Sequence, residues 1–213
     1  MLIDFSEIKS GYDFEKFAEL FLRHLGYKIL RGAAIGSDGG VDIICEESLA
    51  YSQGSYRWLV SCKHRSRTIG QNDDCANINK LFEHKCNGFM FVYSSNVTES
   101  LRQSVEKVSS NRYAYKFYEP REIEQIIISL PRMMPLMNQF FPLSHSRFIK
   151  MDQDCHCQMN GHQDGLYIVY VQDDKTQKMV AHVFCDTCCD QYTYHLNESK
   201  IEYAVLTLKK RAY

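Results

Sequence analysis

The sequence predicts an α/β protein, in which a mixed β-sheet flanked by helices is followed by a small β-rich module. An amphipathic helix precedes three segments that are typical of antiparallel strands, and helices and strands then alternate, as in a mixed α/β sheet. Five of the nine cysteines fall after residue 150, which marks a change in composition. We therefore expect one domain over residues 1–130, an apolar linker over 131–150 that packs, and a second module over 151–213.

The first helix is expected over residues 12–25, where six apolar residues recur at helical spacing. Asp13 and Glu15 near its start suit the positive end of the helix dipole, and Gly26 ends it. Two interpretations of Glu15 stay open at this point. It is either a surface residue that complements the dipole or a member of a polar site.

Two of the following strands each carry one charge. Residues 27–31, 39–44 and 56–63 are short and mostly apolar, with Asp42 inside the second segment and Lys63 at the polar end of the third. A charge rarely lies in a buried strand unless it is paired, bound to a metal or catalytic. An Asp to hold a divalent cation and a Lys to stabilise developing negative charge are what metal-assisted phosphodiester hydrolysis needs.

The rest of the first domain is predicted from apolar runs and caps. We expect helices at 71–86, 98–110 and 120–128 and strands at 88–93 and 113–118. Pro120 would occupy the first turn of the last helix, a favoured position for proline.

These residues resemble a known nuclease superfamily. Asp-Gly-Gly-Val-Asp at 38–42 followed by Leu-Val-Ser-Cys-Lys at 59–63 is similar to the core of the PD-(D/E)xK nucleases, and most of all to the Mrr-like restriction endonucleases. The resemblance covers about residues 11–128, including the helix that bears Glu15. It implies a restriction-endonuclease-like fold, Mg²⁺ or Mn²⁺ as cofactor and DNA as substrate. It favours Asp42 over Asp38 as the metal ligand, with Asp38 as a turn residue.

The sequence departs from the family pattern two positions before the lysine. That position is normally Glu, Asp or Gln, and here it is Ser61. A hydroxyl can orient a metal-bound water but is a poorer ligand for a hard cation than a carboxylate. Either Glu15 supplies the missing oxygen, or the site is weakened or inactive.

A basic segment follows the proposed site directly. His64, Arg65 and Arg67 come after Lys63, and such a cluster would suit a phosphate backbone. A solvated basic loop is the alternative. The formal net charge of −1 says little about partners, because a nucleic-acid enzyme needs positive charge only locally.

The late cysteines predict a zinc module. Cys155 and Cys157, and Cys185 and Cys188, bracket two strand-like runs at 166–172 and 179–184, with a hairpin turn at 173–175. Two such pairs brought together by a hairpin would give zinc four tetrahedral ligands and leave no position open for catalysis. Cys189, His156 and His162 are the substitutes if one of the four is not a ligand. The alternatives are reduced cysteines in a small core or a redox Cys-x-x-Cys, which lacks a thioredoxin-like context.

The function predicted from the sequence is a metal-dependent DNA endonuclease with a setting in restriction, defence or repair. A cytoplasmic location is expected, since no segment has the pattern of a signal peptide or a membrane span. Cutting both strands would need two active sites, so a homodimer or a larger complex is expected. One alternative is a nuclease fold that has lost catalysis and binds nucleic acid or protein. Another is a structural zinc protein, which only the cysteine-rich residues 151–213 support.

Overall fold

The computed structural model describes residues 1–33, 41–48, 54–110, 112–148 and 166–208. Within these residues the chain forms two compact units, Phe5–Ile123 and Met1–Asp4 with Glu124–Tyr213. No helix among the described residues is long and apolar enough to cross a membrane.

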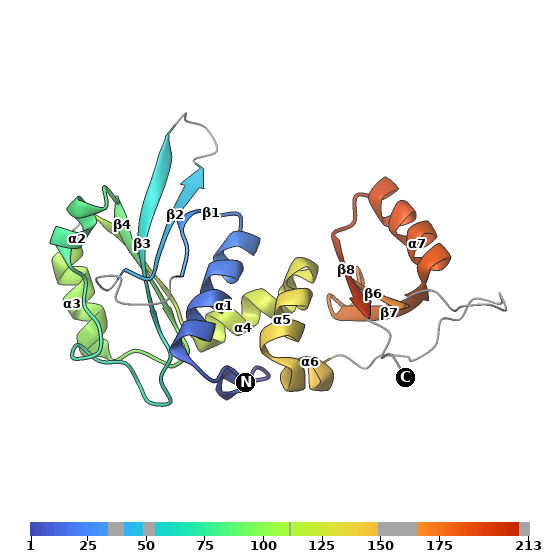
Figure 1. Cartoon of the computed structure of the whole chain (residues 1–213), viewed down its shortest axis with the longest axis horizontal. Coiled ribbons are helices and arrows are strands. Elements are labelled where there is room, and N and C mark those ends of the chain that lie inside the picture. Colours follow the sequence, from blue (N-terminus) through green and yellow to red (C-terminus); the bar gives the residue numbers. More distant parts are fainter. Residues whose placement is uncertain (34–40, 49–53, 111, 149–165, 209–213) are drawn as a thin grey trace. The chain divides into compact units, whose positions relative to one another are not determined.

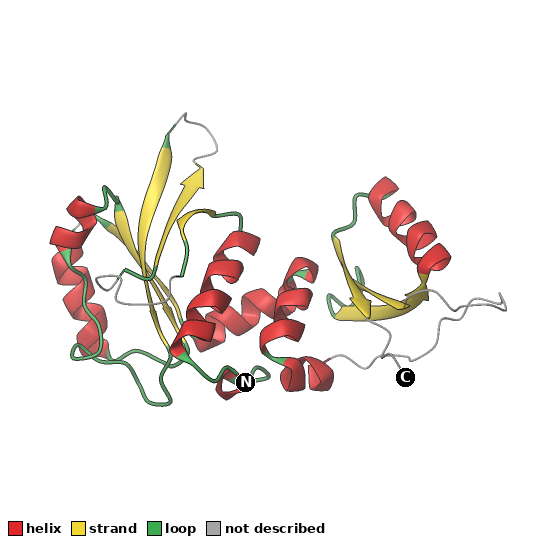
Figure 2. Ribbon diagram, viewed as in Figure 1, coloured by secondary structure: helices red, strands yellow, loops and turns green. Residues whose placement is uncertain are grey.

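The first unit is built on a five-stranded mixed sheet (Figures 1 and 2). The elements in chain order are η1 (Phe5–Glu7), α1 (Gly11–His24), β1 (Lys28–Arg31), β2 (Ile43–Ser48), β3 (Ser55–Lys63), α2 (Ile78–Glu83), β4 (Gly88–Tyr93), α3 (Glu99–Ser109), β5 (Ala114–Tyr118) and α4 (Pro120–Ser129), which continues into the second unit. The strand order follows the sequence, with β1, β2 and β3 antiparallel and β3, β4 and β5 parallel. The predicted mixed α/β sheet with flanking helices is confirmed.

Alternate residues of the strands pack against different helices. Phe117 of β5 belongs to the apolar cluster that includes Leu81 of α2 and Leu101 of α3. The next residue, Tyr118, makes an edge-to-face contact with Phe21 of α1, with ring centroids 5.4 Å apart. Since side chains alternate along a strand, α1 covers one face of the sheet and α2 with α3 covers the other.

The helix expected at 71–86 is shorter than predicted, because α2 covers only Ile78–Glu83. The Asp73 side chain accepts a hydrogen bond from the Gly70 amide at 3.0 Å, which holds a turn ahead of the helix. The side chain of Asn77 then caps α2 by accepting from the amides of Asn79 and Lys80. Short polar side chains that bond to nearby backbone compete with helix in this way.

The second unit combines short helices with a three-stranded antiparallel sheet. It contains η2 (Pro131–Met133), α5 (Met134–Phe140), α6 (Pro142–Phe148), β6 (Leu166–Gln172), β7 (Met179–Cys185), α7 (Asp186–Glu198) and β8 (Tyr203–Leu208), with strand order β7-β6-β8. The apolar linker expected at 131–150 is helical over its described part, and Met133, Met134 and Met137 are fully buried. The sequence pattern predicts β6 and β7 but neither α7 nor β8.

Candidate active site

The carboxylate of Asp42 is held by the backbone of the neighbouring strand. Asp42 directly precedes β2, and only 6% of its surface is exposed. The amide of Cys62 in β3 donates a hydrogen bond of 2.5 Å to Asp42 Oδ2, and the Ser61 hydroxyl lies 3.5 Å from the same oxygen. A buried carboxylate fixed by an amide is a preorganised ligand for a cation.

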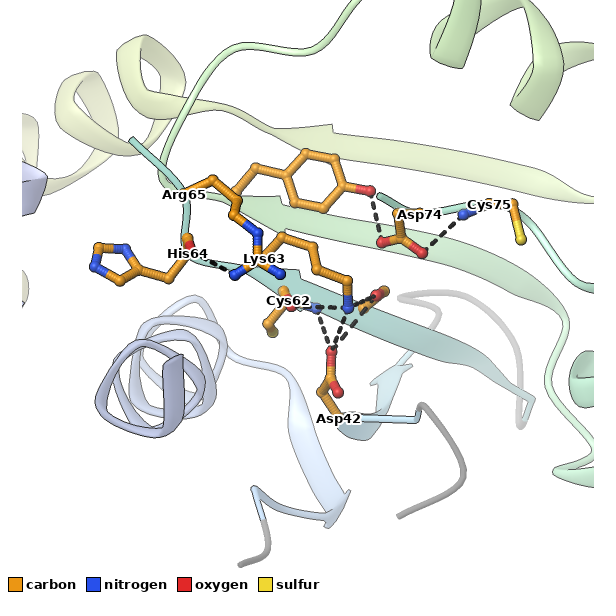
Figure 3. Close-up of polar contacts among 9 residues, drawn as sticks. Asp42, Cys62, Lys63, His64, Arg65, Asp74 and Cys75 are labelled. Atoms are coloured by element: carbon orange, nitrogen blue, oxygen red, sulfur yellow. Dashed lines mark hydrogen bonds and ion pairs between the residues drawn. The ribbon is translucent and has the colours of Figure 1, made fainter. Parts of the chain in front are cut away.

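The ammonium group of Lys63 lies where three oxygens converge (Figure 3). Its Nζ is 3.2 Å from the Cys62 carbonyl oxygen, 3.3 Å from Ser61 Oγ and 3.8 Å from Asp42 Oδ2. A carboxylate, a carbonyl and a hydroxyl are the oxygen ligands that hard divalent cations prefer. The Lys63 ammonium therefore contacts the oxygens that could bind a divalent cation, and this set of oxygens fits Mg²⁺ or Mn²⁺.

Glu15 lies within electrostatic range of the same strand. It is half-buried on α1, and α1 packs against β3. Burial raises the pKa of the Cys62 thiol well above its ordinary value, and the negative charges of Asp42 and Glu15 raise it further. This supports a place for Glu15 beside the site, although no three acidic, His or Cys side chains among the described residues are grouped closely enough to bind one metal ion.

Asp74 also lies in this region, although no sequence pattern predicts a role for it. Its Oδ2 accepts a hydrogen bond of 2.8 Å from the hydroxyl of Tyr93, and Tyr93 is the register partner of Lys63 on β4 (Figure 3). Asp74 and Ser61 line the same cavity, whose volume is about 90 Å³. No local signal could have revealed this, because the contact joins a loop to a strand almost twenty residues away.

The basic segment after Lys63 divides into three different environments. The ring of His64 lies 2.9 Å from the Ile8 carbonyl oxygen and stacks on Phe14, so this side chain is directed into the protein. Arg65 is exposed and donates to the carbonyl of His64 at 3.2 Å. Arg67 forms a two-point ion pair with Asp73, with nitrogen–oxygen distances of 2.6 and 2.8 Å. Of the three, Arg65 is therefore best placed to meet a phosphate.

The predicted zinc ligands are only partly described. Cys155 and Cys157, like the alternatives His156 and His162, lie outside the described residues, as does Asp38 in the first unit. Cys185 ends β7 and Cys188 lies in the first turn of α7, so the chain brings this pair together at one strand–helix junction. Cys189 is buried in the apolar cluster with Val169 and Leu196, which supports Cys188 over Cys189 as the ligand.

A family model described as a restriction endonuclease, Mrr_cat, matches residues 8–113. The matched segment runs from α1 through α3 and contains Glu15, Asp42, Ser61 and Lys63. The match confirms the resemblance to the restriction endonuclease family for this part of the chain. A search of curated proteins finds no match.

Two solved restriction endonucleases are similar to the chain at low identity. The first, "DNA modification-dependent restriction endonuclease AspBHI", has a TM-score of 0.41 and 14% identity over 64% of this chain and 34% of that one. The second, "MspJI Restriction Endonuclease in Complex with 27-mer Oligonucleotide", has a TM-score of 0.38 and 15% identity over 65% of this chain and 32% of that one. The alignments span about a third of the length of each structure. With TM-scores below 0.5, these similarities do not define the site.

Proposed function

We propose that this chain is a divalent-metal-dependent DNA endonuclease of the restriction type, acting in restriction, defence or repair. The observation that carries the proposal is the convergence of three oxygens on the Lys63 ammonium. It occurs inside the segment that matches the restriction endonuclease family. The chemistry of this cluster and the family match both favour phosphodiester hydrolysis.

The cation would be held by the Asp42 carboxylate and the Cys62 carbonyl, with Ser61 and Glu15 acting through water. Mg²⁺ commonly keeps several waters and needs only one or two carboxylates from a protein, so a serine in place of an acid is compatible with binding. The metal would supply a Lewis acid for the scissile phosphate.

Lys63 would take a second role when a cation binds the three oxygens that now surround its ammonium group. Its ammonium and the metal cannot share the same three oxygens, so the side chain would turn toward the phosphate. There it positions the attacking water and stabilises the negative charge that develops on the phosphorane. The exposed Arg65 would hold the DNA backbone beside the site.

Cleavage of both strands requires two active sites, and the described residues of one chain form one candidate site. We therefore propose a homodimer, or a defence or repair complex, as the cutting form. Residues 151–213 would form a structural zinc module with Cys155, Cys157, Cys185 and Cys188 as ligands.

A catalytically inactive nuclease fold is the second candidate, and Ser61 is the observation that favours it. In that case the unit would bind nucleic acid or a protein partner without cutting. The two candidates differ only in chemistry, so a cleavage assay separates them.

The decisive experiment is plasmid cleavage with Mg²⁺ and with Mn²⁺, comparing the wild type with Lys63→Ala. Cleavage by the wild type and its loss in the variant would support the nuclease and assign its site to β3. Full cleavage by Lys63→Ala would refute the proposed mechanism. If neither protein cuts any DNA, including modified DNA, while both bind it, the inactive fold is the better account.

A further inference from the structure

Two adjacent acids in the loop between β3 and α2 have different partners. Asp73 pairs with Arg67 and accepts from the Gly70 amide, and both contacts lie within the loop. The Arg67 side chain lowers the pKa of Asp73 to about 2. Both carboxylate oxygens of Asp73 therefore accept hydrogen bonds from within the loop. Asp74 instead turns toward the sheet.

Asp74 is tied to the strand next to the active site. Its Oδ1 accepts from the Cys75 amide at 2.8 Å, and its Oδ2 accepts from Tyr93. Tyr93 is fully buried at the end of β4, directly opposite Lys63 in the parallel register. The hydrogen bond thus ties the loop acid to the residue that is paired with Lys63 in the sheet (Figure 3).

Asp74 shares a cavity with Ser61, one of the residues proposed at the metal site. The volume of this cavity is about 90 Å³. A water molecule in the liquid takes about 30 Å³, so a cavity of this size holds a few waters or part of a hydration shell. The negative charge of Asp74 also contributes to the raised pKa of Cys62, the residue between Ser61 and Lys63.

We propose that Asp74 supplies the second carboxylate of the metal site, in place of the acid that Ser61 lacks. This inference rests on the proposed nuclease function and identifies a residue that completes it. Asp74 acts through a water coordinated to the cation, because no three acidic side chains among the described residues are grouped for direct binding. The small side chain of Ser61 leaves room on β3 for that water, and the carboxylate of Asp74 provides the negative charge.

The competing account is that Asp74 only satisfies the buried hydroxyl of Tyr93. An unpaired buried hydroxyl is costly, so a purely structural role is physically reasonable. Asp74→Asn separates the two accounts, because an asparagine oxygen still accepts from Tyr93 while the negative charge is lost. Asp73→Asn is the matched control, since it removes the same charge from the adjacent position.

The test measures Mn²⁺ binding to the full chain by electron paramagnetic resonance, together with plasmid cleavage. Asp74→Asn should weaken Mn²⁺ binding at least about tenfold and reduce cleavage, with an unchanged melting temperature. Ser61→Glu introduced into Asp74→Asn should restore both, because it returns a carboxylate to the strand position. Asp73→Asn should bind Mn²⁺ like the wild type.

Three outcomes would overturn the inference while leaving the proposed function intact. These are wild-type Mn²⁺ binding by Asp74→Asn, equal weakening in Asp73→Asn, or failure of Ser61→Glu to rescue. Asp42→Asn serves as the separate control for the proposed function. If Asp42→Asn binds Mn²⁺ as tightly as the wild type, the metal site itself is wrong, whatever Asp74 does.

Discussion

The backbone amide of Cys62 donates a 2.5 Å hydrogen bond to the carboxylate of Asp42, and this contact joins the end of β3 to the start of β2. The two strands are antiparallel, with Ile43 opposite Val60, so Asp42 comes next to Ser61 and Cys62 by register alone. The position of the carboxylate is therefore fixed by main chain and does not depend on the flexible lysine. A rigid strand pair is a more precise support for a site than a loop.

Replacement of Asp42 should separate activity from stability. In Asp42→Asn the amide oxygen can still accept from Cys62, so we expect a melting temperature close to that of the wild type. The lost charge should reduce Mg²⁺-dependent plasmid cleavage by at least about 100-fold. Asp42→Ala leaves the buried amide without an acceptor, which costs about 1–3 kcal/mol and should lower the melting temperature as well. Wild-type cleavage rates in Asp42→Asn would contradict this assignment.

Arg65 and Arg67 should contribute differently to DNA binding. Arg65→Ala is expected to weaken binding to a duplex oligonucleotide and to reduce the slope of log affinity against log salt by about one. Arg67→Ala should change that slope less, because the Arg67 guanidinium is already paired with Asp73. Titrations in Ca²⁺ at several salt concentrations measure both slopes without cleavage. Equal slope changes in the two variants would show that the Asp73 pair opens on binding DNA.

The sequence predicted the strands best where burial is continuous. The run from Gly88 to Tyr93 is buried at every position, and its predicted and observed bounds are identical. The helix predicted from Gln71 begins only at Ile78. The Asp73 side chain accepts from the Gly70 amide and stabilises a turn, which the spacing of apolar residues does not reveal. In this segment the side-chain hydrogen bond to the backbone competes with helix formation and prevents it.

The candidate site was predictable only where it follows the strand register. Asp42 and Lys63 stood out as charges in apolar strands, and the structure brings their side chains together. Asp74 gave no such signal, since its relation to the site depends on Tyr93 and on the path of a loop. The same limit applies to His64, whose contact with Ile8 is set by tertiary packing.

Cys185 should be necessary for zinc binding by the second module. Purified protein should contain one zinc per chain, and Cys185→Ser should lose it and destabilise the second unit. Cys45→Ser is the matched control, because Cys45 is buried in β2 and burial raises the pKa of its thiol to about 12, which opposes thiolate formation. Zinc content by mass spectrometry and melting curves measure both effects. Retention of zinc in Cys185→Ser would contradict the predicted ligand set.

The buried His145 should make the stability of the second unit depend on pH. His145 of α6 is 2% exposed, its Nε2 lies 2.9 Å from the Tyr170 hydroxyl, and burial lowers its pKa below the ordinary value of 6.5. Below about pH 6.5 the unfolded chain therefore binds a proton that the folded chain resists, so the free energy of unfolding falls as the pH falls and recovers as it rises. His145→Gln does not titrate and should flatten this part of the profile between pH 7.5 and 5.5. His195→Gln, on the exposed surface of α7, should keep the wild-type profile. Urea unfolding at fixed zinc concentration measures the three profiles, and an unchanged slope in His145→Gln would assign the pH dependence to other groups.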